Sequence, residues 1–204
     1  MSGFFFAYCS MNFLGHLYFS NNDLDLMYAN LQGDYIKGSN LSHLPEIVQQ
    51  GSHLHRTIDN YIDTHPAVLE LLHLLYPHLP KISGIAVDLY FDHLLARDWS
   101  SYHHTPLRDF IDAFYLHQPY FSSAFTPDFQ FMLEKMQEFD WLYQYQYLRG
   151  LSSASGGLSR RISFENNLHQ APHVFAMLQP EIEMAFQKYM ETAQPFFEDY
   201  FKKD

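Results

Sequence analysis

Apolar residues recur at spacings of three and four along most of the chain, and alternating strand-like runs with Asn-Gly or Asp-Gly turns are absent. This pattern predicts an all-α fold. A length of 204 residues is typical of one domain, and no internal repeat is visible, so we expect a single helical domain. The expected helices cover residues 45–63, 66–76, 82–99, 106–122, 127–147 and 158–168, with a last helix from residue 179 onwards.

Proline and the small residues set the expected boundaries of these helices. Pro45 and Pro66 each mark a helix start, because proline is favoured in the first helical turn. Pro195 is expected to kink or end the last helix. Residues 152–157, which are serine, alanine and glycine only, are expected to form a short loop near a site.

Histidines and aspartates are grouped in two of the expected helices. His55 and Asp59 are four residues apart, which separates them by about 40° around a helix axis, and Asp88 and Asp92 repeat that spacing. His93 lies about 100° further round than Asp92. Each four-residue pair is therefore expected to contribute to one site.

Carboxylate, imidazole and water ligands suit a hard divalent ion such as Mn²⁺ or Mg²⁺. Such an ion lowers the pKa of a bound water and clamps a phosphoryl oxygen, so the pattern favours phosphoester hydrolysis. Asp88 stands in the apolar run IAVDLY, where burying a carboxylate without a partner is costly. For one histidine–aspartate pair taken alone, the alternative is a hydrogen bond on a helix surface or a cap.

The charge and the cysteine content exclude several classes of protein. Asp and Glu outnumber Lys and Arg by 23 to 12, for a net charge of -11, which argues against a nucleic-acid partner. The single cysteine, Cys9, forms no internal disulfide, so a reducing, cytoplasmic setting is expected. No Lys or Arg precedes Lys37 and no apolar run is long enough to span a membrane, so neither a signal peptide nor a membrane partner is expected.

The few arginines stand close to these motifs. Arg56 lies inside the first cluster, Arg97 follows the second, and Arg160 and Arg161 follow the glycine-rich segment. Guanidinium groups bind phosphate through paired N–H donors. For Arg160 or Arg161 alone, ordinary pairing with surface carboxylates is the favoured alternative.

Five segments carry a resemblance to a known family. They are MNFLGHL at 11–17, GDYIKG at 33–38, GSHLHRTID at 51–59, DLYFDHLLARDW at 88–99 and GLSRR at 157–161. From Met11 onwards the chain resembles the bacterial acyl carrier protein phosphodiesterases, also called acyl carrier protein hydrolases, which typically open with MNFLAHL. Residues 11–204 are therefore expected to form the family domain, and residues 1–10 either an N-terminal extension or the product of a misplaced initiation site.

The resemblance implies an all-helical fold distantly similar to the HD-domain metal-dependent phosphohydrolases. It also implies hydrolysis of the phosphodiester that joins 4′-phosphopantetheine to a serine of holo-acyl carrier protein. Mn²⁺ is the implied metal, with Mg²⁺ or another divalent ion as alternatives. The implied metal ligands are His16, Asp34, His55, Asp59, Asp88 and Asp92.

Other residues are expected to assist the reaction. Arg56 or Arg97 would neutralise charge on the phosphoryl group, and His93 is a candidate acid for the leaving group or a further ligand. HD-domain enzymes carry a contiguous His-Asp pair, whereas the order here is Asp92-His93, so their ligand order does not transfer directly.

Acyl carrier proteins are generally acidic, so a chain of charge -11 needs a local basic patch to dock one. The candidate docking residues are Lys37, Arg149, Arg160 and Arg161. Two alternatives stay open from the sequence. One is an HD-like phosphohydrolase that acts on a nucleotide or another small phosphoester, and the other is a non-catalytic helical binding module.

Overall fold

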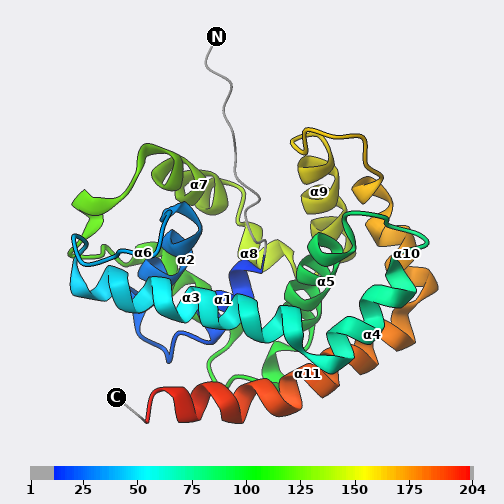
Figure 1. The fold of residues 1–204 in the computed structure, drawn as a ribbon, viewed down its shortest axis with the longest axis horizontal. Coiled ribbons are helices and arrows are strands. Elements are labelled where there is room, and N and C mark those ends of the chain that lie inside the picture. The colour runs from blue at the N-terminus through cyan, green and yellow to red at the C-terminus, as the bar shows by residue number, and fades with distance from the viewer. Residues whose placement is uncertain (1–11, 203–204) are drawn as a thin grey trace.

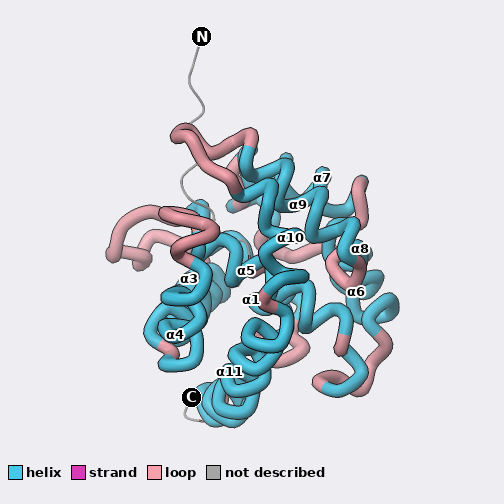
Figure 2. The backbone as a smooth tube through the Cα atoms, turned by 90° about the vertical axis from the view of Figure 1, so that its right-hand side faces the viewer, coloured by secondary structure: helices cyan, strands magenta, loops and turns pink. Residues whose placement is uncertain are grey.

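The computed structural model describes residues 12–202, so the expected N-terminal extension, residues 1–10, lies outside the described residues. Within residues 12–202 every regular element is an α-helix or a short 3₁₀ turn, and these elements form one domain (Figures 1 and 2). The prediction of an all-α domain is confirmed. No helix in this part of the chain combines the length and the apolar character that crossing a membrane requires.

The helices follow one another with short connections. The α-helices are α1 Phe13–Tyr18, α2 Leu24–Gln32, α3 Glu46–Thr64, α4 Pro66–Leu75, α5 Ser83–Arg97, α6 Leu107–Leu116, α7 Pro127–Glu138, α8 Trp141–Gln144, α9 Leu148–Ser159, α10 Ala171–Met177 and α11 Gln179–Tyr200. The 3₁₀ turns are η1 Gly33–Tyr35, η2 Trp99–Ser101, η3 Ser122–Ala124 and η4 Leu168–Gln170. The predicted helices that became α3, α4 and α5 are confirmed to within two residues at each end.

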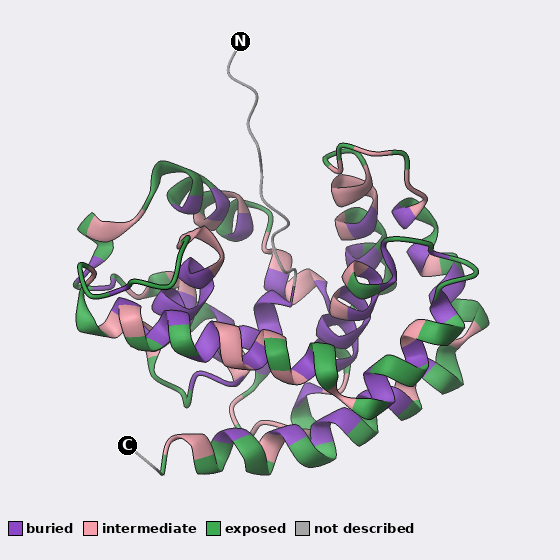
Figure 3. Ribbon diagram, viewed as in Figure 1, coloured by how far each residue is buried: buried purple, intermediate pink, exposed green. Residues whose placement is uncertain are grey.

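Helix α5 lies in the interior, where it contacts α1, α4, α9 and α11. Figure 3 shows it as a mainly buried helix, whereas α3 and α11 each have one buried and one exposed face. A helix that is apolar on nearly all sides belongs in a core. Asp92 and His93 are buried within it, so each of these polar side chains needs a hydrogen-bond partner there.

Helices α2 and α3 pack almost backbone to backbone. A Cβ atom placed on Gly51 would lie 2.4 Å from the carbonyl carbon of Ala29, so only glycine allows this approach. The turn η1 directly follows α2 and also contacts α3. The close packing therefore brings η1 against the histidine-bearing part of α3.

Two expectations about the C-terminal half are wrong. Residues 152–157 are not a loop, because they belong to helix α9. Small residues of α9 serve packing at two positions: Ser155 is buried, and a Cβ on Gly150 would lie 2.0 Å from the carbonyl oxygen of Gln144. The helix expected over 158–168 is absent, since α9 ends at Ser159 and only the turn η4 follows near Leu168.

Other boundaries also differ from the sequence prediction. The helix expected over 106–122 ends at Leu116, and the one expected over 127–147 is divided into α7 and α8 at Asp140, whose φ of 50° is left-handed. Pro195 does not end the last helix, because α11 continues to Tyr200. In Figure 1, α11 runs along the lower edge of the domain and packs against α4.

Candidate metal site

Two histidines and one aspartate converge between α1 and α3. His16 from α1 and His55 and Asp59 from α3 each offer a ligand atom, and the three atoms lie within 4.8 Å of one another. The two imidazole rings are stacked, with centroids 4.2 Å apart. One oxygen of Asp59 lies 3.2 Å from Nε2 of His16, and the other lies 3.3 Å from Nε2 of His55. The carboxylate therefore bridges the two rings.

Asp34 brings a second carboxylate to His55. It stands in the turn η1, and its Oδ1 lies 3.0 Å from Nε2 of His55. Its side chain is mostly buried, whereas that of Asp59 is 32% exposed. Asp59 thus marks the side from which solvent reaches the cluster, and Asp34 holds His55 from within the protein.

The two histidines respond differently to this environment. Burial lowers the pKa of His16, and the charge of His55 lowers it further, against the effect of Asp59. Burial also lowers the pKa of His55, but its hydrogen bond with Asp34 and the charges of Asp34 and Asp59 outweigh burial and raise that pKa. The carboxylates therefore favour a proton on His55, whereas burial disfavours one on His16.

The donor set fits a divalent cation. Nε2 of His16 is buried and has no hydrogen-bond partner among the described residues, although Asp59 is nearby. A buried nitrogen without a partner is costly, and a cation held by these ring nitrogens and the carboxylate would accept its lone pair. Mixed imidazole and carboxylate donors suit divalent first-row metals. The two carboxylate side chains, Asp34 and Asp59, are the acidic groups of the cluster that would attract such an ion.

Asp92 is not brought into this cluster. Its two oxygens accept hydrogen bonds from the backbone N–H groups of Leu14 at 3.0 Å and Gly15 at 2.9 Å. Burial raises the pKa of Asp92 to about 8, although these N–H groups act in the opposite direction. The side chain therefore caps the N-terminus of α1 from the core helix α5, and so fixes the helix that carries His16.

His93 and Asp88 also lie outside the set of three. Nδ1 of His93 donates to the carbonyl oxygen of Tyr145 at 2.6 Å, which ties α5 to the end of α8, and burial lowers the pKa of His93. Asp88 is half-buried on α5. Its charge contributes, after burial and Tyr61, to the raised pKa of Tyr189.

The two candidate arginines have different surroundings. Nη2 of Arg56 donates to the carbonyl oxygen of Gly38 at 2.6 Å, just after η1. Arg97 forms ion pairs of 2.7 Å with both Asp98 and Glu183, and these pairs raise its pKa. Arg56 lies on the same helix as His55 and Asp59. The guanidinium of Arg97, by contrast, is already paired with carboxylates at the end of α5 and on α11.

The four candidate docking residues are all exposed: Lys37, Arg149, Arg160 and Arg161. Lys37 lies beside Gly38, the partner of Arg56. The guanidinium of Arg149 stacks over the ring of Tyr147 at 4.7 Å. Arg160 and Arg161 follow the end of α9.

One residue of this region was not found from the sequence. Asn30 is fully buried in α2, and its Oδ1 lies 2.9 Å from Nδ1 of His16. The sequence offers one indication of its role: Asn30 stands within the largely apolar stretch LMYANL, and a buried amide needs hydrogen-bond partners.

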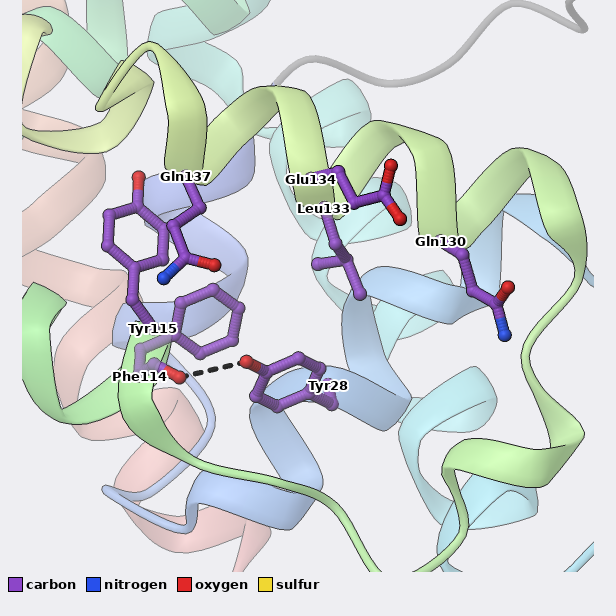
Figure 4. Close-up of a pocket in the computed structure, with 7 residues that line it drawn as sticks. All are labelled: Tyr28, Phe114, Tyr115, Gln130, Leu133, Glu134 and Gln137. Atoms are coloured by element: carbon purple, nitrogen blue, oxygen red, sulfur yellow. Dashed lines mark hydrogen bonds between the residues drawn. The ribbon is translucent and has the colours of Figure 1, made fainter.

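A cavity of about 230 Å³ lies elsewhere, between α2, α6 and α7. Figure 4 shows Tyr28 and Phe114 at one end, joined by a hydrogen bond from the Tyr28 hydroxyl to the carbonyl oxygen of Phe114. The residues that line it are Tyr28, Phe114, Tyr115, Gln130, Leu133, Glu134 and Gln137. None of them belongs to the histidine–aspartate cluster, so the cavity is separate from the candidate metal site.

Similar proteins carry one family description. The sequence model described as "Acyl carrier protein phosphodiesterase" matches residues 11–193. A protein of that name from Photorhabdus laumondii is 28% identical over 158 residues, which cover 74% of this chain and 77% of the relative. Proteins of the same name from Salmonella paratyphi A and Salmonella agona are each 26% identical over 152 residues, which cover 74% of this chain and 79% of each relative. No solved structure matches.

The family match contains all of the residues that form the cluster. His16 lies near its start, and Asp34, His55 and Asp59 follow within its first third. A match over residues 11–193 covers most of the 204-residue chain. The chain therefore belongs to the acyl carrier protein phosphodiesterase family.

Proposed function

We propose that this chain is a metal-dependent phosphodiesterase that hydrolyses the phosphodiester between 4′-phosphopantetheine and a serine of holo-acyl carrier protein. The products are apo-acyl carrier protein and free 4′-phosphopantetheine. The observation that carries the proposal is the convergence of His16, His55 and Asp59 inside the segment that matches the family. The family description supports the substrate, and the donor set supports the metal.

We assign the metal to Nε2 of His16, Nε2 of His55 and the carboxylate of Asp59, with Asp34 beside them. A bound Mn²⁺, or Mg²⁺ or another divalent ion in its place, would supply a water of lowered pKa and an electrophile for a phosphoryl oxygen. The carboxylate of Asp34 lies 3.0 Å from this same Nε2 of His55, so it would serve as a further ligand of the ion. Asp59, as the exposed member, faces the side from which substrate arrives.

We assign the positive charge that faces the phosphoryl group to Arg56. It lies one residue after His55 on α3 and is held by the carbonyl of Gly38. Arg97 is less suited, because Asp98 and Glu183 already neutralise it. A fixed guanidinium stabilises the charge that develops on a phosphoryl group in the transition state.

We also propose that Lys37 and the basic residues of α9 and its end dock the carrier protein. Because the chain has a net charge of -11, the docking of an acidic partner depends on such local positive groups. Charge reversal at Lys37 or Arg149 should raise KM for holo-acyl carrier protein and leave Mn²⁺ affinity unchanged. An unaltered KM in both variants would remove these residues from the interface.

The deciding experiment compares substrates and matched variants. Chelator-treated protein is incubated with Mn²⁺ and either holo-acyl carrier protein or a panel of nucleotides, and loss of the phosphopantetheine group is measured by mass spectrometry. We expect cleavage of the carrier protein, with activity lost in His55→Ala and Asp59→Asn. The control is His53→Ala, because His53 is an exposed residue of the same helix. Cleavage of nucleotides alone, or full activity in Asp59→Asn, would overturn the proposal.

A further inference from the structure

The side chain of Asn30 has its orientation fixed by three hydrogen bonds. Its Nδ2 donates to the carbonyl oxygen of His16 at 2.9 Å and to Oγ of Ser20 at 3.0 Å. The Ser20 hydroxyl donates its own proton to the same carbonyl at 2.7 Å, so it accepts from Asn30. Both neighbours of Nδ2 thus act as acceptors, and the amide cannot be turned round without losing both bonds.

This orientation determines which of the two nitrogens of the His16 ring carries a hydrogen. Oδ1 of Asn30 can only accept, and it lies 2.9 Å from Nδ1 of His16. Nδ1 must therefore carry the hydrogen. In the neutral ring Nε2 then holds the lone pair, and that atom lies 3.2 Å from the carboxylate of Asp59, the neighbouring ligand group.

We propose that Asn30 is a positioning residue that holds His16 in its Nδ1–H tautomer, so that Nε2 is ready to bind a metal before the metal arrives. The inference rests on the metal site of the proposed function and names a residue that sets its affinity. In free histidine the neutral ring prefers the Nε2–H tautomer, in which the lone pair would face Asn30 instead. A hydrogen bond to the second ring nitrogen commonly fixes the tautomer of a metal-binding histidine.

A purely structural role for Asn30 makes a different prediction. Its two donated bonds also fasten the end of α1, so a structural role would affect stability and leave the ring protonation unchanged. Asn30→Asp separates the two roles, because a carboxylate still accepts from Nδ1 of His16 but donates to neither the His16 carbonyl nor Ser20. Asn30→Ala removes both roles.

The test reads the tautomer directly in metal-free protein. Long-range ¹H–¹⁵N NMR of ¹⁵N-histidine-labelled protein should show His16 protonated at Nδ1 in the wild type and in Asn30→Asp. In Asn30→Ala we expect protonation to move to Nε2. The matched control is Gln32→Leu, which removes another buried amide of α2, one that donates to Ala124 rather than to a histidine.

Titration with Mn²⁺ alone then measures the consequence. We expect Asn30→Ala to lower Mn²⁺ affinity by about 10- to 100-fold, and Asn30→Asp and Gln32→Leu to retain it. Wild-type protein with Nε2–H at His16, or unchanged tautomer and affinity in Asn30→Ala, would overturn the inference. The NMR measurement on wild-type protein needs neither metal nor substrate nor a folded variant, so its outcome is independent of whether the proposed phosphodiesterase activity is found.

Discussion

Gly33 supports the candidate site by leaving room for His55. Its φ of -51° and ψ of -38° are ordinary right-handed values that alanine adopts readily, so the backbone gives no reason for glycine here. A Cβ at this position would lie 2.6 Å from both Cβ and Cγ of His55. Carbon atoms in contact lie about 3.5–4.0 Å apart, so Gly33→Ala should push His55 away by about 1 Å.

The magnitude of the effect follows from this displacement. Overpacking costs about 1–3 kcal/mol, and replacing a helical glycine by alanine returns about 1 kcal/mol, so we expect a net loss of roughly 0–2 kcal/mol in the free energy of unfolding. The loss of metal affinity and activity should be larger than the loss of stability, because the 3.0 Å contact between His55 and Asp34 would be broken. A 1 Å misplacement at a site can lower activity by about 100-fold.

Urea unfolding and Mn²⁺ titration of Gly33→Ala measure the two effects separately. The control is Gly84→Ala, since a Cβ on Gly84 meets nothing within 4 Å. This control should raise the free energy of unfolding by about 0.5–1 kcal/mol and leave Mn²⁺ affinity unchanged. If Gly33→Ala is equally stabilising and binds Mn²⁺ like the wild type, then His55 is not seated against Gly33 and the reasoning fails.

Three further predictions concern neighbouring groups. Asp92→Ala leaves buried N–H groups of α1 without acceptors, so urea unfolding should show a loss of about 1–3 kcal/mol; an unchanged midpoint would contradict the cap. In metal-free protein the pKa of His55 is higher in the folded chain than in the unfolded chain. Its pairing with Asp34 therefore stabilises the fold fully below the unfolded-state pKa, and this stabilisation is lost as pH rises through the folded-state pKa. The stability difference from Asp34→Asn should therefore shrink as pH rises above 6.5, the ordinary pKa of histidine, while Mn²⁺ affinity rises, and flat profiles would refute the assignment. Arg97→Ala should change the free energy of unfolding by no more than about 1 kcal/mol and leave kcat/KM unchanged, whereas Arg56→Ala should lower kcat/KM. A lower kcat/KM in Arg97→Ala and an unchanged one in Arg56→Ala would exchange the roles of the two arginines.

The sequence predicted those parts of the site that depend on local geometry. His55 and Asp59 lie in one cluster because a four-residue spacing on one helix fixes their relative positions. The same spacing holds for Asp88 and Asp92, but which way α5 faces is decided by packing against other helices. Asp92 consequently points at the start of α1, a direction that no spacing within α5 could reveal.

The errors in secondary structure have a similar cause. Helix α9 begins with Leu148-Arg149-Gly150 and continues through a run of small residues that local propensity assigns to a loop. Burial of Ser155 and the approach of the Gln144 carbonyl to Gly150 make small size an advantage there. Glu183, which forms an ion pair with Arg97, is 86 residues away in the sequence. The sequence therefore could not predict that this arginine is neutralised by a carboxylate.

The Asp92 cap divides assembly of the site into a local step and a global one. Asp34, His55 and Asp59 come from one continuous stretch, α2 to α3, whose helices pack directly on each other. His16 belongs to a six-residue helix that is too short to be stable alone and is anchored by a side chain 78 positions away from Leu14. A chain in which α5 has not yet docked would therefore hold an incomplete site, so binding of the proposed metal at full affinity would report that α5 has docked in the core.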